Sequence, residues 1–348
     1  MRRDRRGGLT RMALLLACAG ALFVAACGRG GSEAIVAAER LKLRSSTAEV
    51  SRVTAELPIG SRVTVLGRAD EGGVSWARVA SPEGQEGWAE ARYLVSQEVA
   101  DSSRRLADEM RGVPAQALGR SKATLKLRLS PDRTAEGNVV MTLPANTELE
   151  IVDRERRPRP VANERGAANG AAQPVANVKE GEPPGGLKYD EWYKVRLKGN
   201  QIVPAGWIYG GSVELEVPPE ISYYASTGRR IVGWQKIGTA RGDRESGDHY
   251  LALERRASDA DERVNFDRIK VLAYDPARRD YSTPFREDVE GKFPLTLKID
   301  GSRGTFQVQA FDAQGNLRPL DYAIELEPNN RVRVTRLTPR EPVQPKRR

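Results

Sequence analysis

Residues 41–67 read LKLRSSTAEVSRVTAELPIGSRVTVLG, and residues 125–153 read LKLRLSPDRTAEGNVVMTLPANTELEIVD. Both segments begin with the same tetrapeptide, 84 positions apart, and both carry a Leu-Pro pair before a turn of small residues, at Leu57-Pro58 and at Leu143-Pro144. An alternating apolar run follows each turn. The two segments therefore predict an internal repeat, which must be recognised first because it decides the fold of everything it covers.

The tryptophans extend the repeat. The first copy continues as VSWARVASPEGQEGWAEARYLV (74–95) and the second as EWYKVRLKGNQIVPAGWIYGGSVEL (191–215). Each continuation has a tryptophan strand, a glycine-containing turn and a Gly-Trp pair, so four of the five tryptophans lie at matched places: Trp76, Trp88, Trp192 and Trp207. Short alternating runs separated by Gly, Pro and Ser turns predict small antiparallel barrels.

This order of features resembles bacterial Src-homology-3 (SH3) domains, the small barrels of many exported cell-envelope proteins. The resemblance covers residues 36–97 and 118–217. It implies two barrels that bind extended peptides through exposed aromatic side chains beside turns. The second copy departs from the pattern by an insertion rich in Pro, Gly, Ala and Asn. We predict that residues 154–188 form a disordered loop, and folding on a partner is the alternative.

Residues 98–117 predict a helical linker between the copies. Apolar residues form a thin stripe on an otherwise charged segment, which is typical of a helix lying on a neighbouring domain: Val99, Leu106 and Met110. Gly112 and Pro114 end the pattern.

No third copy follows, but the β pattern continues. The run TFQVQAF (305–311) alternates apolar and polar residues, as a half-buried antiparallel strand does. We therefore expect an all-β protein with two small SH3-like barrels joined by a short helix, followed by a separate antiparallel β domain at 222–337. A disordered basic tail is predicted for 338–348.

Side-chain alternation sorts the residues around the matched tryptophans. Ala77 and Val79 share one strand face, and the opposite face holds the tryptophan and charged residues; the second copy divides in the same way. We expect the charged face to lie toward solvent. The candidate ligand-binding residues are therefore Trp76, Arg78, Trp192 and Arg196. The alternative is that loops or a neighbouring domain cover both tryptophans.

Another group of aromatic residues is predicted to pack rather than bind. Trp88 and Trp207 follow glycines and precede apolar residues. Tyr193 shares a strand face with Val195. With Tyr93, these residues are expected to stabilise the barrels.

The amino terminus predicts an export signal. Five arginines accompany an apolar run, Met12 to Ala26, that is too short to span a membrane. Small residues then precede Cys27, and this junction resembles the lipobox of bacterial lipoproteins. The resemblance implies a signal peptide at 1–26, lipidation of Cys27 and a lipidated tether at 27–35. The alternative is an ordinary signal peptide with an unrelated cysteine.

The charge balance bears on partners. The chain has a net charge of +9; without residues 1–26 it keeps 51 basic and 46 acidic side chains, a net charge of +5. A mixed surface on an exported chain argues against nucleic acid. We expect the membrane, through the lipid on Cys27, and a cell-wall peptide or an envelope protein as partners. The location expected is the cell envelope, facing the periplasm, and Gly28 after the cysteine favours the outer membrane.

Residues for hydrolytic chemistry are scarce. His249 is the only histidine, and Cys27 is the only cysteine outside the signal, so neither a zinc site built of several His or Cys nor a free Cys/His centre is available. No nucleophile-elbow sequence occurs. We expect no enzyme activity, no cofactor and no metal, and we expect His249 to be a loop residue.

Two classes of function follow. In the first, the tandem barrels of a lipid-anchored envelope protein bind cell-wall peptide or a protein partner. In the second, the protein is a structural subunit of an envelope assembly with no small ligand. A cell-wall hydrolase that uses His249 or a pair of carboxylates is the third, less favoured possibility.

Overall fold

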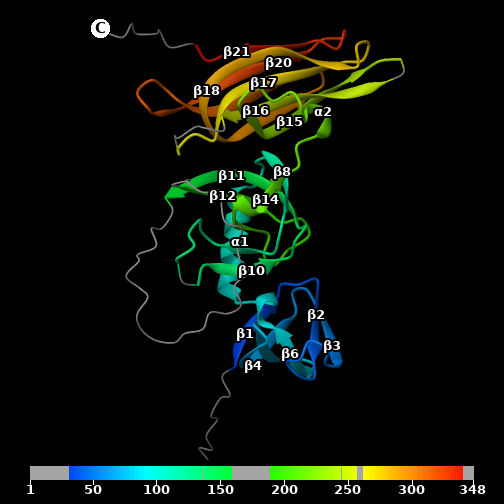
Figure 1. Ribbon diagram of the computed structural model, residues 1–348, viewed down its shortest axis with the longest axis vertical. Coiled ribbons are helices and arrows are strands. Elements are labelled where there is room, and N and C mark those ends of the chain that lie inside the picture. The colour runs from blue at the N-terminus through cyan, green and yellow to red at the C-terminus, as the bar shows by residue number, and fades with distance from the viewer. Residues whose placement is uncertain (1–30, 136, 159–188, 244, 257–261, 340–348) are drawn as a thin grey trace, which may run out of the picture.

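Three antiparallel sheets of seven strands each follow one another along the long axis of the protein (Figure 1). The computed structural model describes residues 31–135, 137–158, 189–243, 245–256 and 262–339. The predicted all-β fold is confirmed. Cys27 and the predicted signal lie outside the described residues. Within the described ranges, no helix is both long enough and apolar enough to cross a membrane.

The first sheet has the strand order β3-β2-β6-β5-β4-β1-β7. Its strands are β1 (Ser32–Val36), β2 (Arg40–Arg44), β3 (Val53–Pro58), β4 (Arg62–Glu71), β5 (Val74–Ala80), β6 (Glu86–Glu90) and β7 (Leu94–Val95), with a 3-10 turn, η1 (Ala91–Tyr93), before β7. One face of the curled sheet forms its core, because alternate residues such as Leu41, Leu43, Ala77 and Val79 are buried together.

The second sheet repeats that order strand for strand, as β10-β9-β13-β12-β11-β8-β14. Its strands are β8 (Ala117–Ser121), β9 (Leu125–Arg128), β10 (Val139–Leu143), β11 (Glu148–Pro158), β12 (Tyr189–Arg196), β13 (Ala205–Tyr209) and β14 (Val213–Leu215), with η2 (Gly210–Ser212) in the place of η1. The sequence repeat is therefore also a repeat of topology.

The LKLR tetrapeptide and the Gly-Trp pair belong to one contact in each sheet. The leucines of both tetrapeptides are fully buried, and a glycine lies directly over them. A Cβ atom on Gly87 would lie 2.8 Å from the Cβ of Leu43, and one on Gly206 would lie 2.7 Å from the Leu127 side chain. Any larger residue would separate the two strands, which explains why both copies keep glycine there.

The tetrapeptide belongs to the second strand of each sheet in chain order. β1 and β8 precede it and pair with β4 and β11. Residues 32–35, predicted as part of the tether, therefore belong to the first sheet, where Ala34 and Ile35 are buried. Their apolar run is too short to indicate a strand by itself; pairing with β4 is what orders it.

Helix α1 (Gln97–Glu109) packs on the second sheet (Figure 1). Ser96 caps its amino terminus, because the side chain accepts a hydrogen bond from Val99 N. Ser103, which the apolar stripe did not indicate, is fully buried, and its hydroxyl donates to Ala205 O at 2.6 Å and accepts from Ala205 N at 3.1 Å. The helix is thereby fixed to β13.

The predicted disordered insertion begins later than residue 154. β11 extends to Pro158 and pairs with β12 from Tyr189 onward, so residues 154–158 form a regular hairpin stem. Arg154 is 2% exposed and donates from Nη1 to Asn265 O at 3.0 Å. The stem thus contacts the third sheet, and residues 159–188 lie outside the described residues. The low-complexity composition of this segment does not indicate that β11 and β12 continue up to its two ends.

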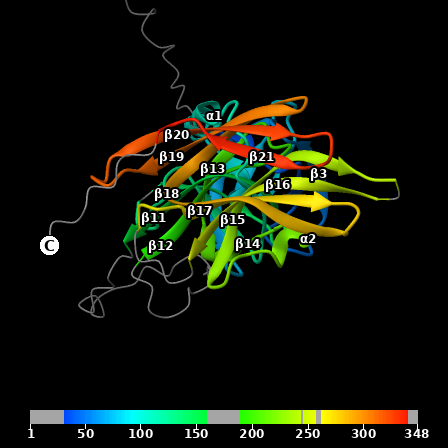
Figure 2. The ribbon, with the colours of Figure 1, turned by 90° about the horizontal axis from the view of Figure 1, so that it is seen from above.

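The third sheet is a meander in sequence order: β15 (Arg229–Arg241), β16 (Ser246–Arg256), β17 (Phe266–Asp275), β18 (Asp280–Asp300), β19 (Arg303–Phe311), β20 (Leu317–Leu326) and β21 (Val332–Arg336). A short helix, α2 (Pro219–Ser222), precedes it. Seen from above, β17 and β18 extend over the β11–β12 side of the second sheet (Figure 2). The sheet has its own core, which includes Phe266, Leu295, Phe306 and Tyr322.

The residues after α1 connect the second and third sheets. Gln116 donates from its side-chain amide to Leu295 O at 2.9 Å and accepts from Leu295 N at 2.7 Å, while its backbone oxygen accepts from Trp234 N at 2.8 Å. One apolar cluster is also shared by all three units, from Ile35 through Ile151 to Trp234. The third sheet is thus a unit with its own core that is held to the second by paired backbone groups.

The carboxyl-terminal boundary also differs from the prediction. Thr338 was assigned to the basic tail, but Asp321 N donates to its hydroxyl at 2.8 Å. Residues 340–348 lie outside the described residues.

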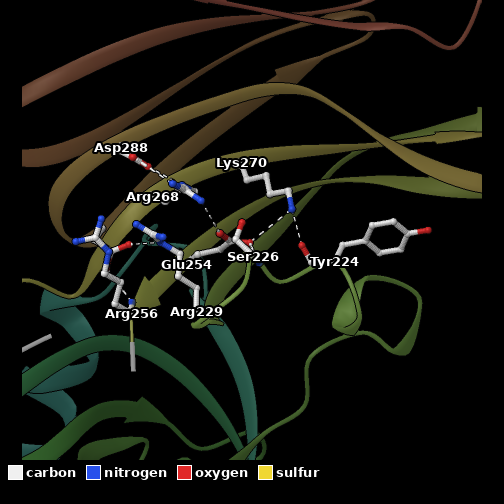
Figure 3. A network of polar contacts seen from close by, with 9 residues as sticks. Tyr224, Ser226, Arg229, Glu254, Arg256, Arg268, Lys270 and Asp288 are labelled. Carbon is white, nitrogen blue, oxygen red and sulfur yellow. Dashed lines mark hydrogen bonds and ion pairs between the residues drawn. The ribbon is translucent and has the colours of Figure 1, made fainter. Parts of the chain in front are cut away.

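A buried polar network fastens the connecting segment 223–228 to the third sheet (Figure 3). Glu254 is fully buried and accepts a hydrogen bond from Ser226 N at 3.0 Å. Its carboxylate lies 3.7 Å from Lys270 Nζ and 4.0 Å from Arg268 Nη1. Lys270 also donates to Tyr224 O. The carboxylate therefore offsets the charge of the buried Lys270 and orients the segment that enters β15, while Arg268 is also paired with Asp288.

We expect Glu254→Ala to lower the free energy of unfolding by about 3–5 kcal/mol, because it leaves Lys270 buried without its counter-charge and Ser226 N without its acceptor. The control is Glu86→Ala, which removes an exposed ion pair with Arg78 and should cost at most about 1 kcal/mol. Urea unfolding of the two variants measures the difference. Equal losses would contradict a stabilising role for the network.

The carboxyl group of Asp153 in the hairpin stem is expected to make the stability of the protein depend on pH. Burial raises the pKa of its carboxyl to about 6, against the opposing effect of a hydrogen bond from Arg154 N and of Lys292 and Lys194. Between pH 4 and 6 the folded protein therefore holds a proton that the unfolded chain has released, and stability increases as the pH falls. We expect Asp153→Asn to stabilise the protein by about 1–2 kcal/mol at pH 7.5 and to have no effect near pH 4.

The control for that experiment is Asp288→Asn, whose effect on stability at pH 7.5 is expected to have the opposite sign. A hydrogen bond from Arg268 lowers the pKa of Asp288, so its carboxylate stabilises the fold above pH 4, and that variant should lose stability at pH 7.5. Thermal denaturation at the two pH values measures both. An Asp153→Asn effect that does not change with pH would show that burial of the charge is not its cause.

Candidate functional site

The outer face of the first sheet carries two rows of side chains that cross three strands. The β5–β6 register pairs Trp76 with Glu90 and Arg78 with Trp88, and the β2–β6 register pairs Arg44 with Trp88. Continuing the second register by two residues along β2 completes the other row. The rows are Lys42–Glu90–Trp76 and Arg44–Trp88–Arg78. The predicted division into a core face and a charged face describes this sheet.

A groove of about 580 Å³ lies on this face along β2. Its lining includes Glu39, Arg40, Lys42, Arg44, Trp76, Glu90 and Tyr93. Arg92 forms an ion pair at 2.6 Å with Glu90 of this lining, and its guanidinium lies over the Tyr93 ring, 4.8 Å from the ring centre. Tyr93, predicted as a packing residue, is half-buried and contributes to the groove as well as to the core.

Trp76 forms part of the groove but is not solvent-exposed. Only 4% of the residue is accessible, so the prediction that it faces solvent is wrong. Strand parity alone does not reveal this burial. The indole Nε1 of Trp76 is buried and has no hydrogen-bond partner among the described residues. A buried unpaired donor costs about 1–3 kcal/mol, which an incoming acceptor would offset.

Arg78 and Trp88 occupy the second row, outside the groove lining. Arg78 is exposed and donates to Glu86 at 2.9 Å, and Trp88 is half-buried. The structure therefore does not bring Arg78 together with Trp76 in one groove. The two side chains share a face but belong to successive rows.

The equivalent face of the second sheet is covered. Its rows are Lys126–Tyr209–Trp192 and Arg128–Trp207–Lys194, from the corresponding registers. Trp192 is 1% exposed, so the predicted exposure is wrong here too, and Trp207 is also buried. The Trp192 and Tyr209 rings meet edge to face at 6.1 Å. These aromatic side chains form a small buried cluster apart from the main core.

A loop residue covers this cluster. Arg133 lies over the Tyr209 ring, 3.9 Å from its centre, and its Nε lies 3.1 Å from Asp190. Arg128 lies 5.9 Å from the centre of the Trp192 ring. In the first copy the residue at the position of Tyr209 is Glu90, which has no ring for an arginine to stack on. The second copy therefore supplies an internal cover that the first copy lacks.

Arg196 joins the end of α1 to the second sheet. It donates from Nη1 to Val113 O at 2.8 Å and to Met110 O at 3.2 Å, and from Nε to Glu150 at 3.0 Å. Lys194, beside it, binds Glu109 at 2.6 Å. These partners satisfy the carbonyl groups at the helix end and hold the linker in place.

Tyr193 is buried in the core of the second sheet, and its hydroxyl donates to Glu191. Arg154 and Arg230 hold the pKa of Glu191 at about 2 despite burial, which alone would raise it. Glu191 therefore stays ionised and pairs with one arginine from the stem and one from β15.

His249 is a strand residue, not a loop residue. It lies on β16, is 2% exposed, and accepts a hydrogen bond from Tyr274 N through Nδ1 at 3.0 Å. Burial lowers the pKa of its imidazole, with Asp248 opposing the shift. The described ranges contain no group of three or more His, Cys, Asp or Glu that would hold a metal ion.

Sequence reasoning missed the cationic side of the groove. The tetrapeptide of the first copy predicts only a repeat, yet Lys42 and Arg44 line the groove with Arg40. The available signal was the alternation itself, since Leu41 and Leu43 face the core and leave all three cations on the other face.

Residues 39–95 match the family model of the bacterial SH3 domain. These residues form a bacterial SH3 domain. The match covers β2 to β7 of the first sheet and includes the whole groove lining except Ala38. The groove is thus a feature of the SH3 domain itself.

No curated protein matches the chain. Among solved structures, NlpC2 from Trichomonas vaginalis is 12% identical, with 88% of this chain and 97% of that chain covered and a TM-score of 0.17. NlpC1 from the same organism is 12% identical, with 85% and 89% covered and a TM-score of 0.17. Similarity at this TM-score carries no argument about fold or activity.

Proposed function

We propose that the protein is a non-catalytic component of the cell envelope that binds peptide in the groove of its SH3 domain. The observation that carries the proposal is an open groove lined by Trp76, whose buried indole N–H has no hydrogen-bond partner among the described residues. An extended peptide offers a carbonyl acceptor every residue, which suits one buried donor beside a strand. The ring itself is too covered to act as a stacking surface.

The second sheet is proposed to be another SH3-like barrel with a structural role. The identical strand order, the matched glycines over leucines and the matched tryptophans support this relationship. Arg133 and α1 cover the face on which the first copy keeps its groove. Its task would be to hold the SH3 domain, the helix and the third sheet in a fixed arrangement.

The location is proposed from the sequence. The signal-like segment 1–26 and the lipobox-like junction at Cys27 support a lipid-anchored protein facing the periplasm, with the outer membrane favoured by Gly28. β1 begins at Ser32, so a lipid on Cys27 would keep the SH3 domain close to the membrane surface. A cell-wall peptide is the partner that such a position favours.

Absence of catalysis is part of the proposal. The one histidine is buried and accepts a backbone hydrogen bond, and no cysteine follows Cys27. A wall hydrolase would instead release soluble fragments from purified sacculi, and it would lose that activity in a His249→Ala variant or on changing a carboxylate.

The alternative is a structural subunit of an envelope assembly with no small ligand. The aromatic face of the second sheet favours this function, because the protein's own residues pack on it where a ligand would otherwise bind. A stoichiometric protein partner after crosslinking, together with no retention on sacculi, would support it.

Retention on purified sacculi tests the proposal with Trp76→Phe. This variant keeps most of the ring volume but removes the N–H, so we expect five- to tenfold weaker binding with stability nearly retained, the loss of one buried hydrogen bond of about 1–1.5 kcal/mol. The matched control is Trp192→Phe on the covered face, which should bind like the unaltered protein. Absence of retention, or equal effects of the two variants, would contradict a peptide site at Trp76.

A further inference from the structure

Three cations on β2 have no counter-charge. Arg40, Lys42 and Arg44 lie on one face of the strand, and no carboxylate of the described ranges lies within ion-pair distance of any of them. The neighbouring arginines of the same domain are paired, Arg78 with Glu86 and Arg92 with Glu90. Other arginines of the domain, Arg52, Arg62 and Arg68, also have no ion pair among the described residues, but the groove gathers three unpaired cations on one strand face.

The groove also offers donors in a defined arrangement. Trp76 lies in the same cross-strand row as Lys42, and Glu90, which lies between them, is paired with Arg92. Arg44 donates from Nη1 to Ser51 O at 2.9 Å, which limits the freedom of its guanidinium. Lys42 and Arg40 are exposed and long, so they can shift to admit a ligand to the indole. A ligand that fits must supply acceptors.

The size of the groove suits a short peptide. The side chains of Arg40 and Arg44 are separated by four residues, about 13 Å along a strand. That length accommodates three or four extended residues. A carboxylate near Lys42 would lie between the two arginines and within about 10 Å of the indole, two cross-strand spacings away.

The second copy, whose outer face is covered by the protein's own residues, arranges the corresponding arginine differently. Arg128, at the position of Arg44, is 5% exposed and lies over the Trp192 ring. The corresponding row is covered by Arg133, which pairs with Asp190. The copy with an internal cover has buried its arginine, whereas the copy with the open groove keeps its cations accessible.

Resting on the proposed peptide-binding function, we propose that the SH3 groove selects peptides carrying a carboxylate. The carboxylate binds between Arg40, Lys42 and Arg44, and an adjacent carbonyl accepts the Trp76 N–H. Charge-assisted hydrogen bonds of this kind are roughly twice as strong as neutral ones. The carboxylate is either a free chain terminus or an acidic side chain, since both present the same pair of oxygens.

The test compares purified sacculi with sacculi whose carboxyl groups have been converted to amides. We expect the full chain to be retained on the first and to bind the second at least tenfold more weakly. Arg40→Gln combined with Lys42→Gln should reduce retention on untreated sacculi 10- to 100-fold and abolish the difference between the two materials. Arg78→Gln, on the same face but outside the groove, should stay within twofold of the unaltered protein.

Competing peptides identify the source of the carboxylate. Acetyl-tetra-alanine with a free terminus, the same peptide as its amide, and an amidated peptide with one internal Glu are added to the sacculi. Competition by either anionic peptide, but not by the neutral amide, supports the proposal and names the source. Equal retention on native and amidated sacculi would overturn the carboxylate proposal while leaving the peptide-binding function intact. Absence of retention on both would overturn the function itself.

Discussion

The alternation of side chains along β2, β5 and β6 is the constraint on which the rest of this structure depends. Leu41, Leu43 and Ala77 must face the core of a small sheet, so every lysine, arginine and tryptophan between them is placed on the outer face. The repeat produces the same outer face twice. What differs is the surroundings of the tryptophan: in the second copy Arg133 lies over the Tyr209 ring and lines a groove of about 450 Å³ with Asp190 and Trp192, whereas unpaired cations line the groove of the first copy.

The closed face explains how the protein keeps its units together. Arg196 and Lys194, on the outer face of β12, hold the end of α1. Gln116, just before β8, joins the second sheet to the third through hydrogen bonds of its side chain and backbone. The stem of β11 and β12 adds Arg154 to this junction. The second sheet therefore acts as a central support, and its tryptophans stabilise that support instead of meeting a ligand.

Much of this architecture follows from the sequence. The repeat, the two faces of the tryptophan strands and the position of the helix are all set by local spacing, and the match over residues 39–95 agrees with the resemblance for the first copy. Strand parity favours exposure of Trp76 and Trp192, and their burial is predicted only as the alternative, because it depends on contacts that strand parity does not show. Residues 154–158 looked like part of a low-complexity insertion, and only pairing with β12 reveals them as a strand. The cations of β2 are not among the predicted ligand-binding residues, because the repeat alone accounts for the tetrapeptide to which Lys42 and Arg44 belong.

The central claim is that a ligand engages the indole of Trp76 and not the tryptophans of the covered face. The five tryptophans give five indole N–H signals in a ¹⁵N-resolved NMR spectrum, and single Phe variants assign them. Titration with soluble cell-wall peptide fragments should shift the Trp76 signal downfield, as expected for a newly formed hydrogen bond, and leave those of Trp192 and Trp207 in place. A titration that moves Trp192 or Trp207, or that leaves Trp76 unchanged at saturation, would contradict the account.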